Sequence, residues 1–209
     1  MIREILRIQY AESTLPESWI FDGGKREIKV PIVFSVFLIC TERKKILVDA
    51  GCETMPGFDM QNFKTPMTAL REKGIEPSDI TDVVITHAHH DHIECVGYFK
   101  NAVVHIQEDE LVGGKKYLGE HPRVCTFGEE TTIEEDVKVV KIGGHSRGSC
   151  VVECKTEDKI CVLCGDECYS LQNLKERIPT ARSYSPENSR AFIEKYTHPP
   201  YVCLLCHDV

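Results

Sequence analysis

The sequence predicts an α+β fold, a mixed arrangement of strands and helices in one domain over residues 1–209. A length of 209 residues is sufficient for one well-packed core. Apolar runs of strand length recur along the chain, and segments with helix start and stop signals lie between them. No run approaches the ~20 apolar residues of a membrane span, so we expect no membrane partner.

The expected elements follow from alternation, turn residues and helix signals. Residues 2–9 alternate and form a first strand, whereas residues 11–29, which contain Pro16 and two glycines, form a loop. Trp19 and Phe21 in this loop either line a pocket or pack on the core. Further strands are expected at 32–40, 45–49, 83–85, 102–107, 137–142, 149–154, 159–163 and 201–205. Helices are expected at 66–73, 93–99, 108–117, 170–177 and 186–196.

Composition limits the partners and the compartment. A net charge of -8 disfavours nucleic acid, which requires a basic face, and leaves a small-molecule substrate. Residues 1–7 interleave charges with apolar side chains and lack the core of a signal peptide, so we expect a cytoplasmic protein. The eleven cysteines are then expected to be free thiols. Nothing in the sequence indicates the oligomeric state.

Two C-x-x-C pairs, Cys161/Cys164 and Cys203/Cys206, suggest a zinc ribbon or a redox site. Each pair lies in an apolar run that we interpret as a buried strand. Cysteines three residues apart on a strand point to opposite faces, so they cannot share one metal ion. A redox motif would also need a helix start after its first cysteine. We therefore expect neither site.

The chain is organised around residues 82–92, where an apolar strand runs directly into potential metal ligands. These have the spacing H-x-H-x-D-H and are His87, His89, Asp91 and His92. Imidazole and carboxylate suit divalent ions such as zinc, and a bound cation would hold crowded imidazoles neutral. His90, between the ligands, is expected to point away from the metal.

Three further candidates also follow apolar strands: His145, Asp166 and His207. The seven groups would supply two metal ions. One ion would take His87, His89 and His145, the other Asp91, His92 and His207, and Asp166 would bridge the pair. Asp49, at another strand end, is either an acceptor for the N–H of a ligand histidine or a turn-forming residue.

Five motifs together resemble the metallo-β-lactamase superfamily over nearly the whole chain. They are V-D-A-G at 48–51, T-H-x-H-x-D-H at 86–92, G-H-S-x-G-S at 144–149, G-D at 165–166 and H-D at 207–208. This resemblance implies a four-layer αββα sandwich with the metal site at one edge, between the sheets.

Within the superfamily the chain is similar to the N-acyl homoserine lactonases. Tyr169 follows Asp166 by three residues, where those lactonases place a tyrosine that contacts the substrate carbonyl, and residues 29–49 look like their N-terminal strands. The chain departs from its relatives at Glu94-Cys95, where many have small residues, and at Cys206, where glycine is usual. Residues 119–127 are also shorter than in lactonases, and the chain ends two residues after His207.

The resemblance implies a metallo-hydrolase in which hydroxide bound by two zinc ions opens an ester-like bond, with an N-acyl homoserine lactone as the first candidate substrate. Manganese or iron could occupy the same ligands. Asp91 would shuttle a proton, and Tyr169 would donate a hydrogen bond to the oxyanion. Relatives that use two irons for redox chemistry carry glutamate in place of His89, so His89 favours hydrolysis.

Other activities stay open on the sequence. A thioester hydrolase of the glyoxalase II type usually carries a C-terminal helical extension for glutathione, which does not follow His207. A mono-iron sulfur dioxygenase would consume oxygen. A nuclease is disfavoured by the acidic charge, and a secreted β-lactamase by the absent signal peptide. A non-catalytic metal-binding sensor module usually loses ligands, whereas all seven are present here.

Overall fold

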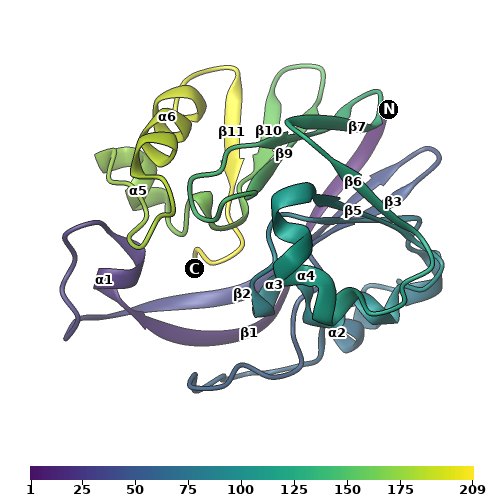
Figure 1. The fold of residues 1–209 in the computed structure, drawn as a ribbon, viewed down its shortest axis with the longest axis horizontal. Helices are drawn as coiled ribbons and strands as arrows, with labels where there is room; N and C mark the ends of the chain where they lie inside the picture. Colours follow the sequence, from purple (N-terminus) through teal and green to yellow (C-terminus); the bar gives the residue numbers. More distant parts are fainter.

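The computed structural model describes residues 1–209 as two β-sheets that pack face to face, with helices on their outer faces (Figure 1). The first sheet has the order β1-β2-β3-β4-β5-β6, with β1 (Ile2–Pro16), β2 (Lys29–Thr41), β3 (Lys45–Val48), β4 (Asp82–Ile85), β5 (Val103–Gln107) and β6 (Val124–Phe127). The second has the order β11-β10-β9-β8-β7, with β7 (Glu130–Glu134), β8 (Val137–Lys141), β9 (Cys150–Lys155), β10 (Ile160–Leu163) and β11 (Tyr201–Leu204).

Six α-helices complete the layers: α1 (Glu17–Ile20), α2 (Pro66–Glu72), α3 (His90–Ile93), α4 (Leu111–Leu118), α5 (Leu171–Glu176) and α6 (Pro186–Tyr196). Three apolar cores separate them. Residues such as Ile46 and Val152 fill the space between the sheets. Leu70 of α2 packs on the outer face of the first sheet, and Phe192 of α6 on that of the second. These layers confirm the predicted αββα sandwich.

The site-bearing loops meet because several strands run in the same direction. Strands β3, β4, β5 and β6 are parallel neighbours in the first sheet, and β10 and β11 are parallel in the second. The C-terminal ends of parallel strands lie at one edge of a sheet, and loops that follow them converge there. Asp49 follows β3, His87 follows β4, Asp166 follows β10 and His207 follows β11.

The structure corrects two predicted elements and adds two strands. The loop expected at 11–29 is wrong at both ends, because β1 continues to Pro16 and pairs with β2 down to Lys29, with α1 between them. The helix expected at 93–99 is instead α3 followed by a 3₁₀ segment, Glu94–Tyr98. Strands β6 and β7 were not predicted. Their neighbours supply the pairing that their own sequences do not signal.

The cysteine pairs lie as the strand argument predicts. Cys161 packs between the sheets and Cys164 on the outer side of the second sheet, beneath α6. In the second pair, Cys206 packs between the sheets and Cys203 packs on the outer side of the second sheet. All eleven cysteines are free thiols. No helix is long and apolar enough to cross a bilayer.

Candidate metal centre

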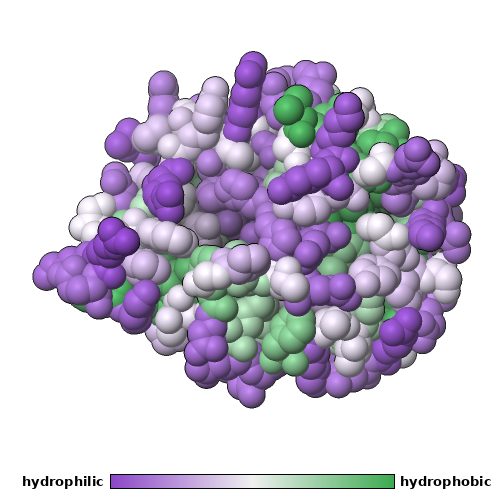
Figure 2. Space-filling model, turned by 60° about the horizontal axis from the view of Figure 1, so that its bottom comes forward, coloured by the Kyte–Doolittle hydropathy of each residue, from purple (hydrophilic) through white to green (hydrophobic).

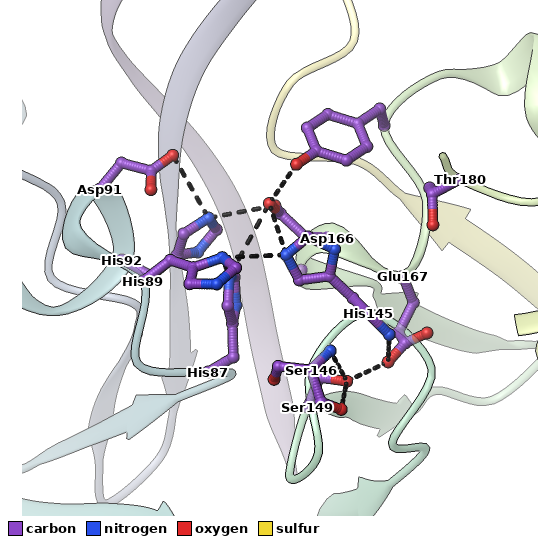
Figure 3. A network of polar contacts seen from close by, with 12 residues as sticks. His87, His89, Asp91, His92, His145, Ser146, Ser149, Asp166, Glu167 and Thr180 are labelled. Atoms are coloured by element: carbon purple, nitrogen blue, oxygen red, sulfur yellow. Dashed lines mark hydrogen bonds and ion pairs between the residues drawn. The ribbon is translucent and has the colours of Figure 1, made fainter. Parts of the chain in front are cut away.

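The first predicted ligand set converges on one point (Figure 3). His89 Nδ1 lies 2.9 Å from His87 Nε2 and 3.0 Å from His145 Nε2. Asp166 Oδ2 faces the same point, 3.4 Å from His145 Nε2 and 3.7 Å from His87 Nε2. Three ring nitrogens and one carboxylate oxygen are therefore held at the spacing of ligands around a single ion.

The second set lies on the other side of Asp166. Oδ1 of this carboxylate is 3.0 Å from His92 Nε2 and 3.1 Å from His207 Nε2. Asp91 Oδ2 lies 3.6 Å and 3.7 Å from the same two nitrogens. One oxygen of Asp166 thus faces each set, which is the geometry of a bridging ligand. All seven residues predicted from the sequence are brought together.

The chemistry of these groups fits divalent cations. His92 Nε2 and His207 Nε2 are buried and have no close partner other than the shared Asp166 Oδ1, a crowding of polar atoms that a cation among them would relieve. Burial lowers the pKa of His87 well below its ordinary value and that of His145 to about 4, so both are neutral ligands at pH 7. In the second set, Asp166 and neighbouring carboxylates outweigh burial and raise the pKa of His92, which marks a place where positive charge is stabilised.

Outer hydrogen bonds fix which ring nitrogen faces the centre. Asp49 Oδ2 accepts from His92 Nδ1 at 2.7 Å, and its two oxygens also accept from the Thr86 N–H and hydroxyl. The first of the two sequence interpretations of Asp49 is therefore confirmed. The carbonyl oxygen of Val33 accepts from His207 Nδ1 at 2.8 Å. Such partners orient ligand imidazoles and raise their basicity.

Two buried glutamates that sequence reasoning missed hold the ligand loops in place. Glu110 accepts from Ala88 N–H at 2.7 Å, from the Ser146 hydroxyl at 2.7 Å and from Gly148 N–H at 2.8 Å. It therefore ties the loop after β4 to the loop that follows His145. Glu167 accepts from the N–H groups of Gly144 and His145, and from the Ser149 hydroxyl (Figure 3). The only sequence signal was the position of Glu167 next to the G-D motif.

Tyr169 lies beside the centre, and its predicted contact with a substrate stays a prediction. Its hydroxyl donates to Asp166 Oδ2 at 2.6 Å, and its ring stacks on His207 with centroids 5.2 Å apart. Burial and the Asp166 charge raise the pKa of Tyr169 well above its ordinary value of 10, so it stays protonated at neutral pH. His90 lines the cavity but bonds elsewhere, accepting from the Tyr117 hydroxyl and donating to the Thr54 carbonyl, in keeping with its predicted absence from the metal set.

The centre opens into a cavity of about 660 Å³. One wall is apolar and comprises Leu15, Trp19, Ile32, Phe34, Met55 and Phe58. Trp19 therefore lies in the pocket wall, whereas Phe21 is buried in the core. At the rim, Arg182 lies over the Trp19 ring, 4.7 Å from its centroid. Figure 2 shows a face on which apolar and hydrophilic residues adjoin around a hollowed area.

This geometry agrees with a family match. A model described as the metallo-beta-lactamase superfamily matches residues 33–206. The chain belongs to the metallo-β-lactamase superfamily. As predicted, it is a hydrolase of that superfamily.

Curated relatives of this superfamily member include lactonases. The N-acyl homoserine lactonase AiiB of Agrobacterium fabrum is 27% identical over 206 residues, covering 80% of this chain and 70% of that protein. Metallo-beta-lactamase domain-containing protein 1 of Rattus norvegicus is 33% identical over 187 residues, covering 83% and 68%.

Solved structures show the same fold. An N-acyl homoserine lactone hydrolase with N-hexanoyl-L-homoserine bound at its catalytic metal centre has a TM-score of 0.87, at 19% identity, over 100% of this chain and 94% of its own. The dizinc quorum-quenching lactonase AidC has a TM-score of 0.78 at 15% identity, over 100% and 90%.

Proposed function

We propose that this protein hydrolyses acylated lactones, with an N-acyl homoserine lactone as the representative substrate, at a centre of two divalent metal ions. The observation that carries the proposal is the pair of ligand sets that share Asp166 and open into a cavity with one apolar wall. Two ions held in these sets would polarise an ester carbonyl and activate water at neutral pH. Zinc is the first candidate, because every predicted ligand is an imidazole or a carboxylate.

The cavity supports a substrate with a polar head and an apolar tail. The lactone ring would sit against the histidines, while an acyl chain would lie on the wall formed by residues such as Phe34 and Phe58. Burying each methylene of such a chain contributes about 0.8 kcal/mol. Relatives whose names specify N-acyl homoserine lactones support the same substrate class.

Two residues of the chain have assigned tasks in this proposal. Tyr169, held protonated by its surroundings, would turn its hydroxyl from Asp166 to the oxygen of the attacked carbonyl and donate a hydrogen bond there. Asp91 lines the cavity beside both histidines of the second set. It is therefore positioned to take a proton from the attacking water and deliver it to the leaving alkoxide.

The test is a substrate panel on zinc-reconstituted protein with metal content measured in parallel. We expect two zinc ions per chain and hydrolysis of N-hexanoyl and N-decanoyl homoserine lactones, abolished by chelation and restored by zinc. A glutathione thioester that is turned over faster than any lactone would overturn the substrate assignment. One iron per chain with thiol-dependent oxygen uptake would overturn the two-metal hydrolase.

A further inference from the structure

The second ligand set contains a thiol beside its two histidines. Cys206 is 1% exposed, and its Sγ lies 3.9 Å from Asp166 Oδ1. The ligand atoms of His92, Asp166, Cys206 and His207 all lie within 4.8 Å of one another. A buried thiol therefore lies in the same small group as the two histidine nitrogens that face Asp166 Oδ1.

The sulfur lies where the apolar core between the sheets meets the candidate metal centre. Cys206 Sγ donates a weak hydrogen bond to the carbonyl oxygen of Gly165 at 3.5 Å, which metal binding would exchange for a stronger metal–sulfur bond. Asp91, the other candidate for this set, is more exposed, at 11% of its side chain, and its Oδ2 lies 3.6 and 3.7 Å from the two ring nitrogens.

We propose that Cys206 is a ligand of the second metal ion, and that its sulfur completes a four-ligand set with His92, His207 and the bridging Asp166. On binding, the S–H bond breaks, its proton passes to solvent, and the thiolate forms the metal–sulfur bond. Asp91 keeps its place beside both histidines and lines the cavity, where a proton shuttle must act. This inference rests on the proposed two-metal centre but not on the lactone substrate.

A sulfur ligand also changes which metals the second site prefers. Thiolate is a soft ligand that favours zinc or cobalt over manganese. The thiolate adds a negative charge next to Asp166, which strengthens retention of a divalent ion. We therefore expect the two sites to differ in metal preference.

Cobalt(II) substitution tests the proposal without measuring activity. With the first two equivalents of cobalt, the full-length protein should develop a near-ultraviolet sulfur-to-cobalt charge-transfer band. The band should disappear in Cys206→Ser and Cys206→Ala and persist in Cys154→Ser. Cys154 is the matched control, because it is fully buried in the same intersheet core but at the opposite end of β9 from His145. Chelator competition should show that Cys206→Ser lowers the affinity for the second ion by more than about 10–100-fold, which is the loss expected for a residue that only hydrogen-bonds to a ligand.

Zinc-edge X-ray absorption on the unsubstituted protein keeps the proposal testable if the variants do not fold. One sulfur neighbour at about 2.3 Å per two zinc ions is expected. Two bound zinc ions with only nitrogen and oxygen neighbours would overturn the role of Cys206 and leave the two-metal hydrolase standing. A charge-transfer band that survives in Cys206→Ser would do the same. Failure to bind a second ion at all would instead refute the metal centre on which both proposals rest.

Discussion

Glu110 provides the sharpest test of how the ligand loops are held. Its carboxylate accepts three hydrogen bonds, one from Ala88 beside the H-x-H-x-D-H ligands and two from Ser146 and Gly148 beside His145. In Glu110→Gln, one oxygen becomes an NH₂ group. If the remaining oxygen serves Ser146 and Gly148, a donor faces the Ala88 N–H, and that bond is lost.

The size of the effect follows from the bonds that change. A hydrogen bond to a charged group contributes about 1.5–3 kcal/mol, and stranding a donor with little access to water costs about 1–3 kcal/mol. These contributions overlap, so we expect the free energy of unfolding of the metal-free protein to fall by about 2–4 kcal/mol. Because the two loops carry His89 and His145, metal affinity should fall as well.

Urea unfolding of the metal-free protein and chelator competition for the bound metal measure the two effects. Glu108→Gln is the matched control, since Glu108 is exposed, lies in the same 3₁₀ turn and makes none of these bonds. If Glu110→Gln unfolds at the same urea concentration as Glu108→Gln and holds both metal ions equally well, the carboxylate does not hold the loops and the reasoning fails.

Three other perturbations test separate parts of the molecule. Asp91→Asn should lower kcat for lactone hydrolysis by about 10²–10⁴-fold while elemental analysis still finds two ions; loss of metal instead would make Asp91 a structural ligand. Phe58→Ala should lower kcat/KM for a decanoyl lactone about tenfold relative to a butanoyl lactone, and an unchanged ratio would exclude Phe58 from the acyl wall. Hydrogen bonds from His105, Thr81 and Lys44 outweigh burial and lower the pKa of Asp82 from 3.8 to about 2, so its stabilisation is present above about pH 4 and is lost as the pH falls toward 2. Asp82→Asn should therefore lower the free energy of unfolding in urea at pH 7 by about 1–2 kcal/mol, after allowance for solvent screening at Lys44, and leave activity unchanged. The difference in stability between this variant and the parent protein should narrow below pH 4. A difference that does not change with pH would refute the ion-pair account.

Most of the fold was predictable because buried strands carry their own signal. Strands such as β2 and β10 are continuous apolar runs, and Ser185 with Pro186 marks the start of α6. The predictions failed for strands that form because a neighbouring strand offers them hydrogen bonds, not because of their own sequences. Three of the four residues of β6 are exposed, and this strand exists because β5 offers a parallel edge. β1 continues beyond Gln9 because β2, the other arm of its hairpin, pairs with it as far as Pro16.

The ligand set was predictable for a different reason. Each predicted ligand follows an apolar strand in the sequence, so each one can be identified from its own neighbours. The αββα fold then brings the ends of these strands together. Glu110 gave no such signal, because it stands in an E-D-E run that resembles a solvated helix start, and only the packed structure shows that it is buried. The bonding of Asp49 to His92 was likewise one of two interpretations until the loops were joined.

The centre is assembled from both sheets, and this has an energetic consequence. His92 lies in α3, which follows β4 of the first sheet, whereas Asp166 and His207 follow β10 and β11 of the second. Without a cation, these three buried polar groups have mainly one another as partners, with His92 Nε2 and His207 Nε2 at 3.0 and 3.1 Å from the same Asp166 oxygen, and their burial opposes folding. A cation that binds both histidines and Asp166 removes this penalty and links the two sheets at their shared edge. Metal binding should therefore stabilise the sandwich through the relative position of its two halves, at the same edge where the substrate cavity opens.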